Sequence, residues 1–392
     1  MNFICSSPDL NLSGANQLLA SLLQGFIEHG HSAEWVITSH EGNGDSGWLN
    51  ASGLKLINLP RTPLNAVRDR QQHLIDRLNQ ASPCLYFPNF DFDMMWAIPA
   101  FPVNCRSVFI FHSDDPVYYQ AVKDHGKNLD AIVCVSAYLA SKLQRLWPQW
   151  KDRIHHIPFG VTIPLAEIEP ARSTSADGLL EVVYCGRLAH EQKLIGDLAD
   201  IILKCHERNL PIQFHIAGTG PDETEFFQKI AAPLSTGSAI RHGLVSNENV
   251  QILLRRSHIF ILTSAYEGLP VSLLEAMAAG CVPVVTRVAS GIPEVITHGT
   301  NGFIFPIHDT AAMVEQLAML AENREEVVAT AHAAKKRIAE GNYTRTASVS
   351  DYLVLCETLT HQKNTPRKYN RAVLPPNYRL TNRLKSLFNR LS

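Results

Sequence analysis

The sequence contains no run of about 18 apolar residues, the shortest length from which a membrane-crossing helix can be built. Its first residues, MNFICSSPDLN, also lack the charged and then apolar pattern of a secretory signal peptide. These two absences predict a cytoplasmic protein that does not span a membrane. With 45% hydrophobic and 18% charged residues, the chain has the composition of a protein that forms a core.

The sequence also contains no C-x-x-C pair and no cysteine and histidine spacing typical of a metal site. Its eight cysteines are scattered singly, mostly within apolar runs. This distribution predicts reduced thiols in the core of a cytosolic protein.

Acidic residues are absent after Glu357, although the net charge of the whole chain is only −2. The last 35 residues therefore form a basic tail. A helix over 378–391 would place several apolar side chains on one face, as in helices that lie on an anionic membrane surface; they are Leu380, Leu384, Leu387, Phe388 and Leu391. A helix packed on the body of the protein, or a disordered tail, fits equally well. Aromatic residues are too sparse there to favour nucleic-acid binding.

The length of 392 residues suits two domains of about 150 to 200 residues each. Strand-like apolar runs alternate with helical segments, and the alternation begins again at Leu180 after a segment rich in proline, alanine and serine. This reset predicts two similar α/β domains. We expect domains at 1–163 and 179–341, a linker at 164–178, a helix at 342–360 and the basic tail at 361–392.

Polar residues follow a strand-like apolar run in the stretch 264–286, SAYEGLPVSLLEAMAAGCVPVVT. A loop carries Glu267 and the helix after it carries Glu275, before a second buried strand, VPVVT. Pro270 fits the first turn of that helix, because its fixed φ suits the position and its missing N–H has no partner there. Free N–H groups over 268–272 and the helix dipole would favour an anion. In open parallel sheets, ligands bind at this edge.

The two carboxylates of this stretch can border one pocket, which suits a ligand that has hydroxyl groups near a phosphate. Two simpler interpretations remain open. Ser272 and Glu275 have the spacing of a capping box, in which the glutamate would only stabilise the start of the helix. Glu267 could be a solvated acid in a loop.

Several motifs in this part of the chain resemble those of one family. The segments Glu267-Gly-Leu-Pro270 and Glu275-Ala-Met-Ala-Ala-Gly280, with the following PVV, resemble the E-x7-E signature of retaining GT-B glycosyltransferases of family 4. The segments 291–294 (GIPE) and 299–303 (GTNGF) resemble that family's next loop and hairpin. The resemblance implies a GT-B fold of two Rossmann-like doubly wound domains that face each other across a cleft, with the last helix bracing the first domain.

The resemblance also implies roles for the residues of the signature. Glu275 would bind the ribose hydroxyls of a nucleotide, and Glu267 would face the donor sugar near its reacting carbon. The backbone of Gly268, Leu269 and Pro270 would hold the sugar and the phosphate.

Four further residues are predicted to lie at this donor site by resemblance. Gly14 precedes a predicted helix at 15–29, in a reduced form of the family's glycine loop. His112 follows the buried run RSVFIF, where the family has a histidine close to the donor sugar. Arg187, in the segment GRL, and Lys193 resemble the family's two cations, which would stabilise the charge of a diphosphate leaving group. A hydrogen-bonded loop histidine and solvated cations are the simpler interpretations of these side chains.

Two further patterns point away from other enzyme classes. The opening strand, loop and helix do not match G-x-G-x-x-G, which argues against a nicotinamide-binding domain. Asp91 and Asp93 imitate the D-x-D metal motif of a different glycosyltransferase fold. We expect no metal ion and no cofactor, since a GT-B enzyme needs no such motif.

The sequence therefore predicts a retaining, metal-independent glycosyltransferase. It would move a sugar from a nucleotide-diphosphate sugar to a glycan or a lipid-linked acceptor. A sugar-nucleotide epimerase, a phosphorylase on the same fold and a non-catalytic protein that keeps the nucleotide pocket are the alternatives.

Overall fold

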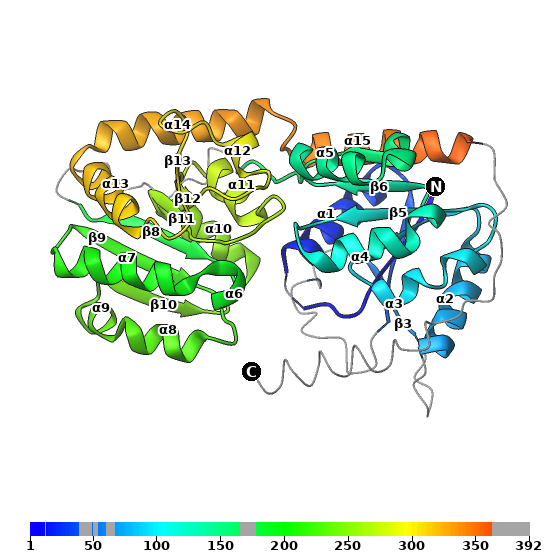
Figure 1. The fold of residues 1–392 in the computed structure, drawn as a ribbon, viewed down its shortest axis with the longest axis horizontal. Coiled ribbons are helices and arrows are strands. Elements are labelled where there is room, and N and C mark those ends of the chain that lie inside the picture. The colour runs from blue at the N-terminus through cyan, green and yellow to red at the C-terminus, as the bar shows by residue number, and fades with distance from the viewer. Residues whose placement is uncertain (12, 39–48, 50–53, 60–66, 165–177, 363–392) are drawn as a thin grey trace.

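Two parallel sheets, one in each half of the chain, form the frame of the molecule (Figure 1). The fold is taken from a computed structural model, which describes all residues except 12, 39–48, 50–53, 60–66, 165–177 and 363–392. The first sheet has the strand order β3-β2-β1-β4-β5-β6-β7. Its strands are β1 (Asn2–Ser7), β2 (Ser32–Ile37), β3 (Lys55–Asn58), β4 (Cys84–Pro88), β5 (Cys105–Phe111), β6 (Ala131–Cys134) and β7 (Ile154–His156).

The second sheet has the order β10-β9-β8-β11-β12-β13. Its strands are β8 (Leu180–Cys185), β9 (Ile212–Ala217), β10 (Ala239–Gly243), β11 (Ile259–Leu262), β12 (Val282–Thr286) and β13 (Phe303–Phe305). All strand pairs in both sheets are parallel. The expected fold class, α/β with two Rossmann-like doubly wound domains, is confirmed.

Helices cover the faces of both sheets. In the first half they are α1 (Gly14–Glu28), α2 (Val67–Ala81), α3 (Phe92–Met95), α4 (Pro116–His125), α5 (Ala137–Leu146) and the short helices η2 (Ile98–Ala100), η3 (Gly126–Asn128) and η4 (Pro148–Arg153). In the second half they are α6 (His190–Lys193), α7 (Ile195–Glu207), α8 (Glu223–Lys229), α9 (Ala231–Thr236), α10 (Asn247–Arg256), α11 (Val271–Ala278), α12 (Ile292–Val295), α13 (Thr310–Glu322) and α14 (Arg324–Glu340). No helix of the described residues is long and apolar enough to cross a membrane.

The central strands read as unbroken apolar runs because helices cover both of their faces. Every residue of β4, β5 and β12 is buried. Strands buried on both faces show no alternation of polar and apolar residues, which is typical of parallel sheets. The apolar run after α5 forms a strand only as far as His156. From there the chain leaves the sheet, and Val161 forms an isolated parallel bridge with Thr344.

The last described helix, α15 (Arg345–His361), packs against the first half of the chain (Figure 1). The Val161 N–H donates to the carbonyl of Tyr343 over 2.8 Å, and the Arg345 N–H donates to the carbonyl of Val161 over 2.9 Å. The Arg345 guanidinium pairs with Glu28 on α1 at 2.8 Å. These contacts hold the start of α15, which follows the second half in the sequence, against the first domain. The expected linker at 164–178 and basic tail at 361–392 lie almost entirely outside the described residues.

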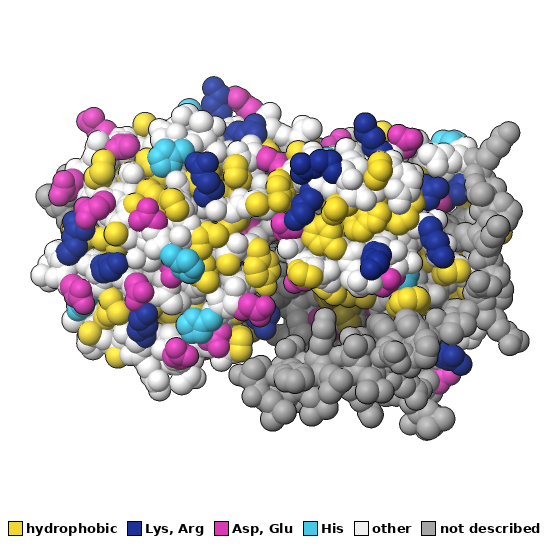
Figure 2. All heavy atoms as spheres, viewed as in Figure 1, with side chains coloured by type: hydrophobic (Ala, Val, Ile, Leu, Met, Phe, Trp, Pro, Cys, Tyr) yellow, Lys and Arg dark blue, Asp and Glu magenta, His cyan; other side chains and the backbone are white. Residues whose placement is uncertain are grey.

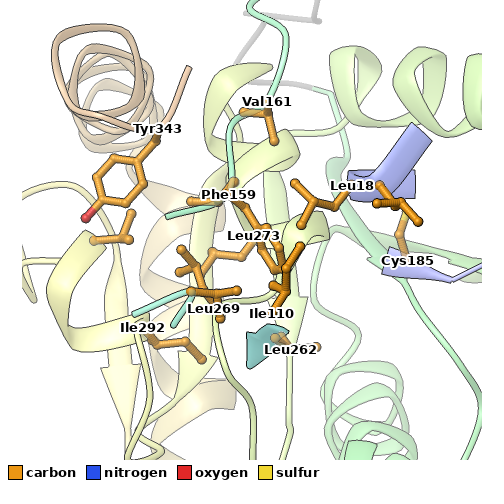
Figure 3. Packing of buried hydrophobic residues seen from close by; sticks show 14 of the residues in the cluster. Leu18, Ile110, Phe159, Val161, Cys185, Leu262, Leu269, Leu273, Ile292 and Tyr343 are labelled. Carbon is orange, nitrogen blue, oxygen red and sulfur yellow. The ribbon is translucent and has the colours of Figure 1, made fainter. Parts of the chain in front are cut away.

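Apolar side chains make a continuous core between the two halves. Figure 3 shows Phe159, from the segment after β7, next to Leu273 of the second half, with Val161 above them and Leu269 below in the same core. All four are buried. The loop that carries Glu267 and the helix that carries Glu275 are therefore packed against the first domain.

Candidate donor site

The residues predicted for the donor site line one cleft between the two halves. Its volume is about 680 Å³. All nine border it: Gly14, His112, Arg187, Lys193, Glu267, Gly268, Leu269, Pro270 and Glu275. In Figure 2, acidic and basic side chains lie next to each other where the two halves meet. The strand orders explain the convergence, because both sheets reverse their order at a central strand and point their carboxyl ends at the cleft.

Glu267, which is buried, and Lys193, which is half-buried, form an ion pair among the residues that line the cleft. The Lys193 ammonium lies 2.5 Å from Glu267 Oε1, and the Ser264 hydroxyl donates to the same oxygen over 2.6 Å. Lys193 is held at the cleft because it is the last residue of α6 and because Thr263 Oγ1 donates to its carbonyl over 2.8 Å. Glu267 is thus a buried, oriented carboxylate and not a solvated loop acid.

Arg187 differs from Lys193, because its side chain is exposed. It follows β8 directly, and the Tyr184 hydroxyl donates to its carbonyl over 2.8 Å. Its guanidinium forms no ion pair with any residue in the described part of the chain. A fork of N–H donors at the edge of a cleft is suited to bidentate contact with a phosphate.

The helix that carries Glu275 begins at Val271, with Pro270 at the N-cap position. Pro270 was expected one residue later in the helix, and Ser272 was a candidate N-cap of a capping box. That capping box is wrong, since Ser272 lies inside the first turn. Because proline offers no side-chain acceptor, no side chain caps this helix end. The N–H groups of the first turn are left for a ligand at the cleft.

Glu275 lies one turn further along α11 and borders the cleft. Burial raises the pKa of its carboxyl to about 7. The cause is the loss of hydration, which disfavours the ionised form. Hydrogen bonds from hydroxyl donors would stabilise the ionised form of this carboxyl, because they replace the hydration that burial removes.

His112 reaches the cleft from the end of β5 in the first domain. Its Nε2 lies 2.8 Å from Asn89 Oδ1. Burial lowers the pKa of the imidazole to about 3, so the ring is neutral near pH 7. Asn89 was not predicted from the sequence. A signal for it existed, because it directly follows the buried strand β4, which neighbours β5 in the sheet.

Gly268 lets the two domains approach each other, and Gly14 lies opposite the same segment of the second domain. A Cβ atom on Gly268 would lie 1.9 Å from the carbonyl oxygen of His112, a distance that only glycine permits. A Cβ on Gly14 would lie 3.4 Å from Val271 at the start of α11. The glycine loop of the first domain therefore faces the helix of the second.

Asp91 and Asp93 do not form a cluster of metal ligands. Asp91 is buried, and it accepts a hydrogen bond from Thr38 Oγ1 over 2.8 Å. Burial raises the pKa of the Asp91 carboxyl to about 6. Asp93 lies on the short helix α3. In the part of the chain that the structure describes, no group of three or more histidine, cysteine or acidic side chains is arranged to hold a metal ion.

Two family models match the chain, one in each half. Residues 180–323 match the family described as glycosyl transferases group 1, and residues 12–163 match glycosyltransferase family 4. Together these segments cover most of the sequence.

Among curated proteins, the chain resembles bacterial polysaccharide glycosyltransferases. It is 25% identical over 216 residues to the putative colanic acid biosynthesis glycosyltransferase WcaL of Escherichia coli, covering 53% of this chain and 52% of WcaL. It is 26% identical over 244 residues to the amylovoran biosynthesis glycosyltransferase AmsK of Erwinia amylovora, covering 59% of each chain. The matches therefore span little more than half the length of these relatives.

Solved structures resemble nearly the whole chain. The pneumococcal O-GlcNAc transferase GtfA, in complex with UDP and GlcNAc, has a TM-score of 0.76 and 10% identity over 92% of this chain and 99% of that one. HepE from Anabaena, in complex with UDP and glucose, has a TM-score of 0.75 and 15% identity over 92% and 100% of the two chains. At such low identity these likenesses establish the GT-B fold.

Proposed function

Because the chain belongs to glycosyltransferase family 4 and has the GT-B fold, we propose that it transfers a sugar from a nucleotide-diphosphate sugar to a glycan or a lipid-linked acceptor. The transfer retains the anomeric configuration and uses no metal ion. The observation that carries the proposal is the convergence of Arg187, Lys193, Glu267, Glu275 and His112 on one cleft.

The diphosphate of the donor binds at the positive side of the cleft. As the glycosidic bond breaks, negative charge develops on the leaving diphosphate and has to be neutralised. Arg187 supplies two parallel N–H donors, Lys193 supplies a point charge, and the uncapped start of α11 supplies backbone donors. Preorganised donors of this kind contribute about 3 to 4 kcal/mol each to transition-state stabilisation. This set of donors would serve the purpose that a divalent cation serves in other folds.

The nucleoside and the sugar lie on either side of the diphosphate. Glu275 accepts hydrogen bonds from the ribose hydroxyls, which favours its ionised form inside a buried site. Glu267 faces the donor sugar, and His112 contacts the sugar from the first domain. When the diphosphate arrives, Lys193 exchanges part of its contact with Glu267 for a phosphate oxygen.

Glu267 acts in this proposal by orienting the sugar and stabilising positive charge near its reacting carbon. Its Oε1 atom is already engaged by the Lys193 ammonium and the Ser264 hydroxyl, which lowers the nucleophilicity of that oxygen. The leaving phosphate then takes the proton of the attacking acceptor hydroxyl on the same face of the sugar. Front-face attack of this kind retains configuration without a covalent intermediate.

The names of the relatives support an acceptor from cell-surface polysaccharide synthesis. WcaL is named for colanic acid and AmsK for amylovoran. We place the acceptor on the first-domain side of the cleft and the enzyme in the cytoplasm, at the inner face of the membrane where lipid-linked glycans are extended. The segment 378–391 would make the membrane contact through its basic and apolar residues.

Incubation of the purified protein with UDP-glucose or UDP-N-acetylglucosamine, in the presence of EDTA, tests the proposal. Release of UDP that depends on an added glycan or lipid-linked acceptor, with a product of the same anomeric configuration as the donor by NMR, supports it. Turnover that depends on inorganic phosphate would assign a phosphorylase instead. Conversion of the donor to its isomer would assign an epimerase, and loss of activity with EDTA would contradict metal independence.

A further inference from the structure

A chain of three buried polar side chains links the glycine loop of the first domain to His112. Asn16 lies on α1, Asn89 follows β4, and His112 follows β5. The two asparagines are fully buried and His112 is 8% exposed. Burying three polar side chains is unfavourable unless each finds hydrogen-bond partners. Each polar atom of the three side chains therefore favours a position beside a hydrogen-bond partner.

The orientation of Asn16 is fixed by the backbone. Its Nδ2 lies 2.8 Å from the carbonyl oxygen of Asn11 and 3.4 Å from that of Asp9. A carbonyl oxygen can only accept, so the amide nitrogen must point toward these two groups. The Oδ1 atom of Asn16 consequently points the other way and is an acceptor.

The orientation of Asn89 follows from that of Asn16. The Asn89 Nδ2 group donates to Asn16 Oδ1 over 3.0 Å, which leaves Asn89 Oδ1 to face His112. This oxygen is 2.8 Å from His112 Nε2 and can only accept. The proton of the imidazole must therefore reside on Nε2. Since the ring is neutral, Nδ1 carries a lone pair and no proton.

The second ring nitrogen of His112 is an acceptor that nothing in the described part of the chain satisfies. Nδ1 is buried and has no hydrogen-bond partner there. His112 is one of the residues that line the cleft, together with Ser113 and Glu267. A buried acceptor without a partner costs about 1 to 3 kcal/mol, which a hydroxyl group of a ligand would recover.

We propose that Asn89 is a positioning residue that holds the proton of His112 on Nε2, so that Nδ1 accepts a hydrogen bond from a hydroxyl of the donor sugar. This inference rests on the proposed function, because the sugar is that of the donor. It assigns His112 the role of an acceptor and excludes it as the acid that protonates the leaving group. The opposite tautomer would present an N–H group to the sugar hydroxyl and remove the acceptor.

NMR of the full chain labelled with 15N-histidine tests the tautomer directly. The His112 signals are identified by their loss in His112→Gln. At pH 7, the wild type is expected to show a neutral ring with a protonated Nε2, and Asn89→Leu is expected to lose this preference. Asn301→Leu is the matched control, because Asn301 is a buried amide of the second domain, bonded to the Val295 carbonyl and the Thr297 N–H away from the cleft.

The wild-type spectrum alone can overturn the proposal, whether or not a variant folds. A proton on Nδ1 at pH 7, or an unchanged tautomer in folded Asn89→Leu, contradicts it. Asn89→Asp provides a second, smaller change that keeps an acceptor oxygen beside Nε2, so Nε2 should stay protonated in it.

Binding of UDP-glucose and of UDP separates positioning from general destabilisation. Asn89→Leu should bind UDP-glucose about fivefold to tenfold more weakly, the equivalent of one hydrogen bond, and bind UDP as the wild type does. If the binding of both ligands is weakened equally, Asn89 affects binding only by stabilising the fold. If the wild type binds neither ligand, UDP-glucose is not its donor, and the histidine spectrum still decides whether Asn89 sets the tautomer.

Discussion

At the scale of single residues, Arg187 is the side chain whose role depends most clearly on a ligand. Because it is exposed and makes no ion pair with the described residues, Arg187→Ala should change the free energy of unfolding by less than about 0.5 kcal/mol. It should nevertheless lower the rate of sugar transfer by about 10²-fold to 10³-fold. Arg256→Ala, an exposed arginine at the end of α10, is the matched control and should keep full activity. Equal activity of the two variants would remove Arg187 from the mechanism.

The raised pKa of Glu275 predicts that both the stability of the protein and its affinity for a nucleotide depend on pH. Its pKa of about 7 in the folded protein exceeds that of an unfolded glutamate, so the folded state holds the extra proton between about pH 4.5 and 7. The stability that this proton confers is present at acidic pH and is lost as the pH rises through 7. Glu275→Gln should therefore show a smaller fall in melting temperature from pH 5 to pH 8 than the wild type.

The same group should make UDP binding weaker at low pH, because the carboxylate form accepts the ribose hydroxyls. Calorimetric titration of the wild type with UDP is expected to show a Kd that rises as the pH falls from 8 to 6. In Glu275→Gln the Kd should be larger and nearly independent of pH. A wild-type Kd that is constant over this range would contradict the assignment of Glu275 to the ribose.

At the scale of elements, the loop before α11 depends on its close approach to the first domain. In Gly268→Ala the new methyl group would overlap the His112 carbonyl, so the loop has to move. We expect a loss of about 1 to 3 kcal/mol of stability, as for other overpacked sites, and a larger loss of donor affinity. Gly196→Ala is the control, since its Cβ would lie 3.7 Å from the nearest atom. Thermal unfolding and UDP-glucose binding measure both effects, and wild-type behaviour of Gly268→Ala would contradict the contact.

A second contact between the domains joins α12 to the start of α5. Glu294 accepts hydrogen bonds from the N–H groups of Ala137 at 3.0 Å and Tyr138 at 2.7 Å. It thus places a carboxylate at the positive end of a helix in the other domain. Glu294→Ala should lower the free energy of unfolding by about 1 to 2 kcal/mol, as the loss of a capping side chain does.

Glu325→Ala offers a comparison for this contact, because Glu325 is an exposed acid in the first turn of α14 and bridges no domains. Its loss should lower the free energy of unfolding by only about 0.3 to 1 kcal/mol. Differential scanning calorimetry should therefore show a clearly lower melting temperature for Glu294→Ala than for Glu325→Ala. Equal melting temperatures would mean that the contact between the domains adds nothing.

The sequence predicted these elements well where the signal is local. The apolar runs of β4, β5 and β12 and the polar residues directly after β5, β8 and β11 placed strands and cleft residues correctly. It placed Pro270 in the first turn of α11 and not at the N-cap, because the fixed φ of proline fits either position. It also missed Asn89, whose partners Asn16 and His112 are 73 and 23 residues away and come together only in the folded sheet.

At the scale of the whole molecule, two sheets in fixed orientation bring cations from one domain and a neutral histidine from the other to the same cleft. The reset of the βα alternation at Leu180 predicted the two domains from sequence. The distances between Lys193, Glu267 and Ser264 could not be predicted, because they depend on where α6 ends relative to β11. The local motifs thus identify the residues, and the packing of the domains determines which atoms meet.

The measurement that tests the central claim most directly is a thermal-shift titration of the purified protein with UDP-, GDP-, ADP- and dTDP-sugars, with and without EDTA. A ligand that binds only the folded state raises the melting temperature, by the equivalent of about 2.7 kcal/mol at a hundred times its Kd. We predict a clear rise with one nucleotide, unchanged by EDTA and absent in Arg187→Ala. No rise with any of the four donors would contradict a donor site in this cleft, and a rise that EDTA abolishes would contradict metal-independent binding.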